Sequence, residues 1–274
     1  IIRLYKPTSG NIIFNGKNIT GKMSHEEIKL LRTKMQMIFQ DPMACLNPRK
    51  KVLDIIGEGL DIHKMYSTKE ERNEKVYNIL EKVGLSREHA SRYPHQFSGG
   101  MRQRIVIAIS LACNPKVLIA DEPTTALDVT IQAQILELIK DLQEKTGVAV
   151  IFITHDLGVV ANMADRVAVM YLGSMVEVAA SETLYENPKH PYTIGLMKSM
   201  PSLANDGERL NVIEGSVPNP LYLPKGCYFA DRCPKAMDKC REAQPGSVKI
   251  KSRHHVSCFL YENDNAESTA AQED

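Results

Sequence analysis

One segment constrains the fold more than any other: an apolar run, Val117–Ala120, that ends in the adjacent carboxylates Asp121 and Glu122. A strand that is apolar at every position is typical of a parallel sheet covered on both faces. Open α/β sheets bind ligands at the carboxyl ends of such strands. Asp121 there can hold Mg²⁺, and Glu122 can orient and polarise an attacking water. Taken alone, the segment could equally be a solvated strand end.

Helix and strand patterns alternate around this segment. Met35–Phe39 and Val148–Thr154 also indicate buried strands, and apolar residues recur at helical spacing from Ile131 to Leu142 before Gly147. The alternation predicts an α/β fold with a parallel sheet. Further along, Arg166–Ala179 indicates an antiparallel hairpin, and the Pro-rich residues 187–226 predict an extended connection.

Composition excludes several classes of protein. Lys and Arg number 34 against 33 Asp and Glu, and a net charge of +1 in 274 residues provides no field for a nucleic-acid backbone. No apolar run approaches the roughly 20 residues that a membrane-spanning helix needs. Residue 1 is Ile, without an initiator Met or a secretory signal, so we expect the chain to begin partway through a larger protein.

Four of the six cysteines, Cys227, Cys233, Cys240 and Cys258, fall within 32 residues. Four thiolates suit zinc or an iron–sulfur cluster, and their spacing lacks the C-x2-C pairs common in structural zinc sites. Unligated thiols or disulfides are the alternatives, with His254 or His255 as a minor alternative ligand.

A second motif lies upstream of the acidic strand. Ser98-Gly99-Gly100 immediately precedes a predicted helix, where exposed backbone N–H groups bind anions. Alone it is a weak signal, but Ser98–Arg104 followed by Asp121–Asp128 is specific.

With these motifs in order, the chain resembles the ATP-binding subunits of ABC transporters over nearly its whole length. The matching elements are the Q-loop glutamine (Gln40), the signature loop (Ser98, Gly99, Gly100), the Walker B aspartate (Asp121), the catalytic glutamate (Glu122), the D-loop (Ala126, Leu127, Asp128) and the switch histidine (His155). For His155 alone, a satisfied histidine at a strand end would be the favoured interpretation.

More specific segments are similar to the oligopeptide and dipeptide importer branch. They are Phe39–Pro42, Leu46–Arg49, Tyr93–Arg104 and His190–Thr193. Met101 departs from the general signature, which has glutamine, but this branch often carries Met there. The branch also carries a similar C-terminal Cys motif associated with a [4Fe–4S] cluster, which favours iron–sulfur over zinc for the four cysteines.

The resemblance implies an α/β, P-loop-type ABC ATPase cassette with a parallel-sheet core, a helical subdomain and an antiparallel β part, followed by a Cys-rich irregular extension. The expected boundaries are 1–186 for the ATPase domain, with the helical subdomain at about 41–112, then 187–261 for the extension and 262–274 for a disordered acidic tail.

The resemblance also implies roles for individual residues. It assigns catalysis to Glu122, His155 and Gln40, Mg²⁺ to Asp121 and Gln40, and ATP to Gln40, Ser98, Gly99, Gly100, Asp121, Glu122, Asp128 and His155. The implied partners are a second ABC ATPase subunit, two transmembrane permease subunits and, indirectly, an extracytoplasmic peptide-binding protein, at the cytoplasmic face of the membrane.

The phosphate loop G-x-x-x-x-G-K-[ST] that such an ATPase requires has one near match, Gly16–Met23. We reject it because Met23 offers no hydroxyl to Mg²⁺ and because Ser24 begins a capping box that leaves Lys22 outside the helix. The true loop should precede Ile1, and the 274 residues alone should not hydrolyse ATP.

Two other functions compete with peptide import. A soluble ABC ATPase of DNA repair or translation should carry a coiled-coil insertion, a second cassette or a basic linker, and the sequence shows none of these. A non-hydrolysing regulatory subunit should have lost catalytic residues, whereas Glu122 and His155 are both present.

Overall fold

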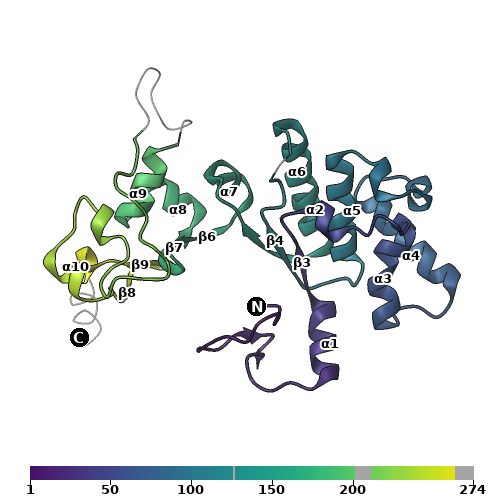
Figure 1. Ribbon diagram of the computed structural model, residues 1–274, viewed down its shortest axis with the longest axis horizontal. Helices are drawn as coiled ribbons and strands as arrows, with labels where there is room; N and C mark the ends of the chain where they lie inside the picture. The colour runs from purple at the N-terminus through teal and green to yellow at the C-terminus, as the bar shows by residue number, and fades with distance from the viewer. Residues whose placement is uncertain (126, 201–210, 263–274) are drawn as a thin grey trace. The chain divides into compact units, whose positions relative to one another are not determined.

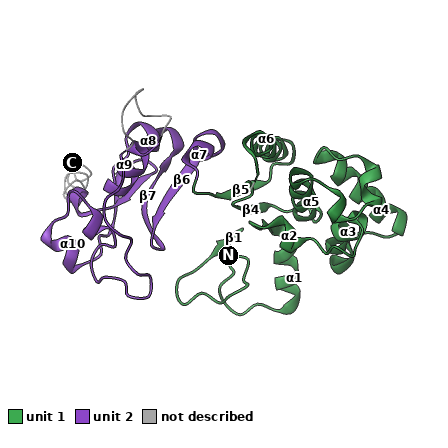
Figure 2. Cartoon of the chain, turned by 45° about the horizontal axis from the view of Figure 1, so that its top comes forward, with its two compact units in different colours: residues 1–155 green, residues 156–274 purple. Residues whose placement is uncertain are grey.

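Three parallel strands form the sheet that the apolar runs predict. They are β3 (Met35–Ile38), β4 (Val117–Asp121) and β5 (Ala149–Ile153), in the order β3-β4-β5, and β3 and β4 run side by side in Figure 1. The computed structural model describes residues 1–125, 127–200 and 211–262. The chain divides into two units, Ile1–His155 and Asp156–Asp274 (Figure 2).

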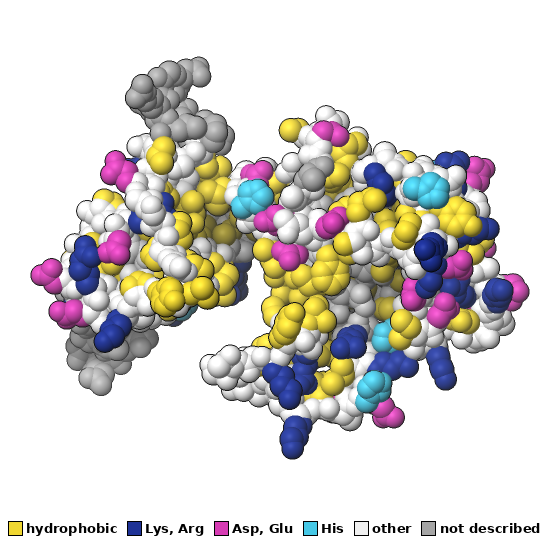
Figure 3. Space-filling model, viewed as in Figure 1, with side chains coloured by type: hydrophobic (Ala, Val, Ile, Leu, Met, Phe, Trp, Pro, Cys, Tyr) yellow, Lys and Arg dark blue, Asp and Glu magenta, His cyan; other side chains and the backbone are white. Residues whose placement is uncertain are grey.

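The first unit surrounds this sheet with helices. Its other elements are β1 (Ile13–Phe14), β2 (Lys17–Asn18), α1 (His25–Lys34), α2 (Pro42–Cys45), α3 (Val52–His63), α4 (Lys69–Lys82), α5 (Gly99–Leu111), α6 (Val129–Thr146) and two 3-10 helices at Arg87–Ser91 and Pro94–Gln96. On the face shown in Figure 3, Lys and Arg side chains are interspersed with Asp and Glu, in keeping with the near-zero net charge.

Local sequence signals set the ends of the helices. Ser24 and Glu27 form the predicted capping box of α1. Thr68 caps α4, which ends before Gly84 at φ +74°, and Gly147 ends α6 at φ +67°. These glycines adopt the left-handed conformation that terminates helices.

Helices α3, α4 and α5 pack together through buried aliphatic residues, among them Ile56, Leu80 and Ile105. Arg72 of α4 donates to both carboxylate oxygens of Asp61 in α3, at 2.6 and 2.7 Å. The guanidinium also fills the space beside Gly57, where any Cβ would clash with it. These helices lie within residues 41–112, the range expected for a helical subdomain.

The near match to a phosphate loop forms a different structure. Gly16 lies at φ +73° in the turn between the antiparallel strands β1 and β2. Met23 packs against a hydrophobic cluster that includes Ile19 and Leu31. The rejection of this segment is therefore confirmed.

The strand predicted at Val148–Thr154 is present as β5, but the prediction that it is buried is wrong. In β5 the side chains of Ile151 and Ile153 are 40% and 45% exposed, and exposure alternates along the strand. The reason is that one face of β5, which carries Ala149, Ile151 and Ile153, is left uncovered by the described residues.

The second unit is built on an antiparallel sheet of order β6-β7-β9-β8. Its elements are α7 (Leu157–Met163), β6 (Arg166–Tyr171), β7 (Ser174–Ala180), α8 (Ser181–Glu186), α9 (Pro191–Lys198), α10 (Asp238–Glu242), β8 (Ser247–Lys251), β9 (His254–Ser257) and two 3-10 helices at Ala230–Arg232 and Phe259–Tyr261. Strands β6 and β7 form the predicted hairpin, turning at Leu172 and Gly173, both at positive φ.

The chain divides between His155 and Asp156, and not at the expected boundary between residues 186 and 187. The hairpin β6–β7 pairs with β9, which follows the Cys segment, so the hairpin and the extension share one sheet. The extension is accordingly more regular than expected, and α9 lies within the stretch predicted to be extended. Pro191 at the first turn of α9, with His190 as its N-cap, is the sequence signal for this helix.

Three predicted features lie outside the described residues. They are Ala126 of the D-loop, residues 201–210 and the acidic tail from 263.

No helix in the described ranges is both long and apolar enough to cross a membrane.

His190 ties the stability of the second unit to pH. Burial lowers the pKa of His190 from its ordinary 6.5 to about 4, although the charge of Glu177 opposes this shift. Its Nδ1 accepts a hydrogen bond from the Tyr192 backbone N–H at 3.0 Å. The neutral form is therefore favoured on folding, and its contribution is complete above pH 6.5 and lost as the pH falls toward 4.

We expect lowering the pH from 7.5 to 5 to cost about 2 kcal/mol of unfolding free energy through this group. His190→Asn keeps an N-cap acceptor but removes the titration, so its urea midpoint should fall less with pH than that of the wild type. The same pH dependence in both proteins would contradict the assignment.

Candidate functional site

Three of the predicted site residues lie together at the carboxyl ends of the strands of the parallel sheet. Gln40 follows β3, Glu122 follows β4, and His155 follows β5. The register pairs Ile38 with Ala120, and Asp121 with Ile153, so the carboxyl ends of the three strands are level. Open α/β sheets bind their ligands at the carboxyl ends of their strands.

The Glu122 carboxylate is the centre of this group. Gln40 Nε2 donates to Glu122 Oε2 at 2.8 Å, and His155 Nδ1 lies 3.1 Å from Oε1. Thr125 Oγ1 donates to Oε2 at 2.9 Å. Hydrogen bonds from His155 first, and then from Thr125, hold the pKa of Glu122 below its ordinary value. Glu122 is therefore ionised at neutral pH and can accept a proton.

The backbone of Glu122 is strained. Its φ of +44° lies in the left-handed region, which is unfavourable for a residue with a Cβ. The Glu122 N–H donates to the Ile153 carbonyl at 2.9 Å and so anchors this residue to β5. Such strain persists only where the surroundings enforce it, and it is characteristic of functional sites.

Asp121 and Asp128 flank this centre along the chain. Asp121 is half-buried at the last position of β4. Asp128 caps α6, and its Oδ1 accepts from the Ile131 N–H at 3.0 Å. Asp128 therefore fixes the start of α6, and the structure gives no contact between its side chain and Glu122.

The signature residues form a separate helix N-terminus. Ser98 caps α5, its Oγ accepting from the Met101 N–H at 3.4 Å, and Gly99 and Gly100 form the first turn. A Cβ on Gly100 would lie 2.5 Å from Cγ2 of Ile131, so glycine is needed for α5 to approach α6. No contact in the described residues joins this turn to Glu122. The turn thus presents N–H groups as a surface of its own.

The four clustered cysteines line one cavity in the second unit, together with His190, Phe229, Lys235 and Phe259. All six cysteines of the chain are free. Burial raises the pKa of Cys227 and of Cys233, and that of Cys258 to about 11. These thiols are therefore protonated at neutral pH.

The expected metal-ligand set is not assembled in this cavity. Among the residues that the structure describes, no group of three or more His, Cys, Asp or Glu side chains is placed so that it could hold a metal ion. His254, the minor candidate ligand, instead bonds Glu177 at 2.8 Å. The four cysteines line the cavity together with Phe229 and Phe259, and a metal would bind them as thiolates.

Sequence reasoning missed Thr125 and Glu177. Thr125 supplies a hydrogen bond to Glu122, and its only signal is its place three residues after that carboxylate. Glu177 is 1% exposed and accepts hydrogen bonds from two segments distant in sequence. A single acidic residue between Val176 and Val178 was its signal.

Comparisons with known proteins agree with this geometry. A family profile described as ABC transporter matches residues 1–125, and one described as oligopeptide/dipeptide transporter, C-terminal region, matches residues 176–240. The oligopeptide transport ATP-binding protein AppD of Bacillus subtilis is 51% identical over 96% of this chain and 81% of its own length. The dipeptide transport ATP-binding protein DppD of the same organism is 52% identical over 93% of this chain and 76% of its own length.

Solved structures show the same fold. cbiO1 of Clostridium perfringens, part of the ABC transporter complex cbiONQ, superposes with a TM-score of 0.61 at 31% identity, covering 68% of this chain and 72% of that one. The ATP-binding cassette MJ0796, dimeric and bound to ADP and Pi, gives 0.58 at 30% identity over 66% of this chain and 77% of its own. The chain belongs to the family of ATP-binding proteins of oligopeptide and dipeptide ABC transporters.

Proposed function

We propose that this protein is the ATPase subunit that energises the import of oligopeptides or dipeptides through an ABC transporter. The observation that carries the proposal is the Glu122 carboxylate, ionised at a strand end and held by Gln40, Thr125 and His155. The names of the related proteins supply the substrate class.

In this proposal Glu122 is the general base for ATP hydrolysis. Its carboxylate accepts a proton from the water that attacks the γ-phosphate, and Gln40 and Thr125 orient it. The side chain of His155 is 76% exposed and can reach a bound γ-phosphate while keeping its bond to Glu122. Mg²⁺ would neutralise phosphate charge when bound, and the half-buried Asp121 with the Gln40 side-chain oxygen would hold it.

Two surfaces of the first unit fit the proposed partners. The free N-terminus of α5 at Ser98–Gly100 would complete the nucleotide site of a second ATPase subunit. Phe39 and Met43 beside Gln40 are 43% and 57% exposed, and they would receive a cytoplasmic segment of a permease subunit. The protein would thus lie at the cytoplasmic face of the membrane, with a peptide-binding protein on the other side.

A soluble repair or translation ATPase is not favoured, because both family profiles and the related proteins are those of transporters. A regulatory, non-hydrolysing subunit is not favoured either, since the hydrogen bonds around Glu122 are intact.

We further propose that the four cysteines bind a [4Fe–4S] cluster. Four thiols facing one cavity supply the donor chemistry that such a cluster takes. The cavity measures about 10 Å³, room for about one water, so a cluster needs its walls to move apart. A single zinc ion, which needs less room, is the second candidate.

Glu122→Gln tests the general base. An amide cannot accept the proton, so we expect ATP turnover in the assembled transporter to fall at least about 100-fold while ATP binding persists. Glu137→Gln, the same change at an exposed position of α6, should leave turnover unchanged. Comparable turnover in the two variants would contradict the role of Glu122.

The 274 residues alone should show no Mg²⁺-dependent ATP hydrolysis, because they contain no complete phosphate loop and Gly16–Met23 forms a hairpin and turn instead. Phosphate release assays on the purified chain test this expectation. Robust hydrolysis would mean that the phosphate loop has been misplaced.

Iron analysis and a visible absorption spectrum of anaerobically purified protein test the cluster. We expect about four irons per chain and thiolate-to-iron absorption. A colourless protein loaded with zinc would overturn the cluster in favour of the zinc site.

A further inference from the structure

The four thiols that line the cavity are positioned by two different parts of the second unit. Cys227, Cys233 and Cys240 come from one segment that is tied together by its own backbone. The Cys227 N–H donates to the Cys240 carbonyl at 2.7 Å, and Gly226 packs so tightly on the backbone of Cys240 and Arg241 that no Cβ would fit. These three thiols are therefore placed by local structure.

Cys258 is positioned by a different element, because it directly follows strand β9. The position of β9 is set by its pairing with β7 and β8, and the β7 pairing is short, joining Glu177 to Val256 and Val178 to His255. Lys239, next to Cys240, lies over the Phe259 ring and bonds Glu262, so the first segment also contacts residues that follow the fourth cysteine. The other support for Cys258 comes from whatever holds β9 against β7.

Glu177 of β7 supplies that connection from inside the unit. Its side chain is fully buried, and its Oε1 accepts from His254 Nε2 in β9 at 2.8 Å. The same carboxylate accepts from the backbone N–H groups of Lys189 and His190, each at 2.8 Å. Glu177 therefore joins β7 both to β9 and to the turn before α9.

Both segments held by Glu177 form walls of the thiol cavity. His190 and Pro191 line it on one side, and Cys258, Phe259 and Leu260 line it just beyond β9. A second bond, from the Tyr261 hydroxyl to the Lys189 carbonyl at 3.0 Å, joins the same two segments to each other.

We propose that Glu177 and His254 are positioning residues of the thiol cavity, which fix the fourth thiol, Cys258, beside the other three. This inference deepens the proposed cofactor site and rests on it for its function. Replacing Glu177 by Gln puts an amide donor where three N–H donors converge, so at least one of the bonds that join β7 to β9 and to the turn before α9 is lost, and the cavity wall loosens.

Alkylation of the reduced, metal-free chain tests the proposal without any cofactor. With iodoacetamide and peptide mass spectrometry, Cys258 in Glu177→Gln should react about tenfold faster than in the wild type, while Cys227, Cys233 and Cys240 keep their rates. His254→Leu, which removes the single bond from β9 to Glu177, should give the same selective increase and serves if Glu177→Gln fails to fold.

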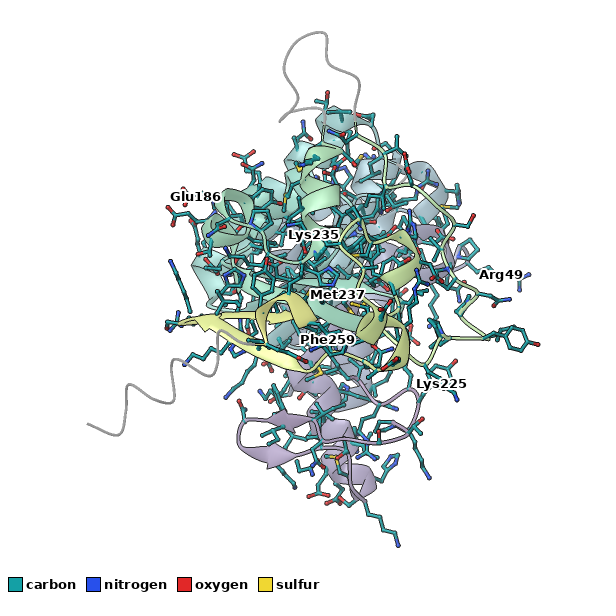
Figure 4. All side chains as sticks on the ribbon, turned by 90° about the vertical axis from the view of Figure 1, so that its left-hand side faces the viewer. Arg49, Glu186, Lys225, Lys235, Met237 and Phe259 are labelled. Carbon is teal, nitrogen blue, oxygen red and sulfur yellow. The ribbon has the colours of Figure 1, made fainter. Side chains whose placement is uncertain are left out.

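Glu186→Gln is the matched control. Glu186 ends α8, is exposed and points away from the unit in Figure 4, so the same chemical change there should leave all four rates unaltered. An unchanged Cys258 in both test variants would overturn the proposal. So would an equal rise of all four rates, because that marks general loosening of the unit.

Cobalt(II) absorption separates this proposal from that of the cofactor site. The wild type should show the spectrum of four thiolates, and Glu177→Gln should resemble Cys258→Ser, which has three. A wild-type chain that binds no cobalt through four thiolates would count against the cofactor site alone, and the alkylation rates would still decide the role of Glu177.

Discussion

The hydrogen-bonded register of three parallel strands is the constraint on which the catalytic end of this protein depends. Gln40, Glu122 and His155 are separated by 82 and 33 residues along the chain, yet they share hydrogen bonds because β3, β4 and β5 end level with one another. A shift of one residue in either pairing would move a side chain away from the others. The backbone bond from Glu122 to Ile153 ties the carboxylate to the same register, even at the cost of a left-handed φ.

Each unit is organised around one carboxylate that joins separate segments. Glu122 accepts hydrogen bonds from the ends of neighbouring strands, and Glu177 accepts them from β9 and from the turn before α9. The two carboxylates differ in solvent exposure: the Glu122 side chain is 24% exposed, whereas the Glu177 side chain is 0% exposed. An accessible carboxylate can exchange a proton with a substrate, and a sealed one with satisfied bonds serves to hold structure.

Much of the first unit could be predicted because its signals are local. The apolar run Val117–Ala120, the capping box at Ser24 and the glycine at 147 each specify their element without reference to the rest of the chain. The burial of β5 could not be predicted this way, since it depends on whether other elements cover each of its faces. The order of Gln40, Glu122 and His155 marked the candidate site, but Thr125 bonds Glu122 through a turn that no pattern specified. In the second unit the contacts are long-range: Glu177 and His254 lie 77 residues apart, and no periodicity links them.

In the proposed function, the level ends of β3, β4 and β5 form the site of ATP hydrolysis. The most direct measurement is a structure of the assembled transporter trapped with Mg²⁺, ADP and vanadate, which stands in for the γ-phosphate during transfer. Vanadate should then lie within hydrogen-bond reach of His155 and beside the Glu122 carboxylate, with the Gln40 side chain beside the metal. Vanadate bound away from the carboxyl ends of β3, β4 and β5 would contradict it.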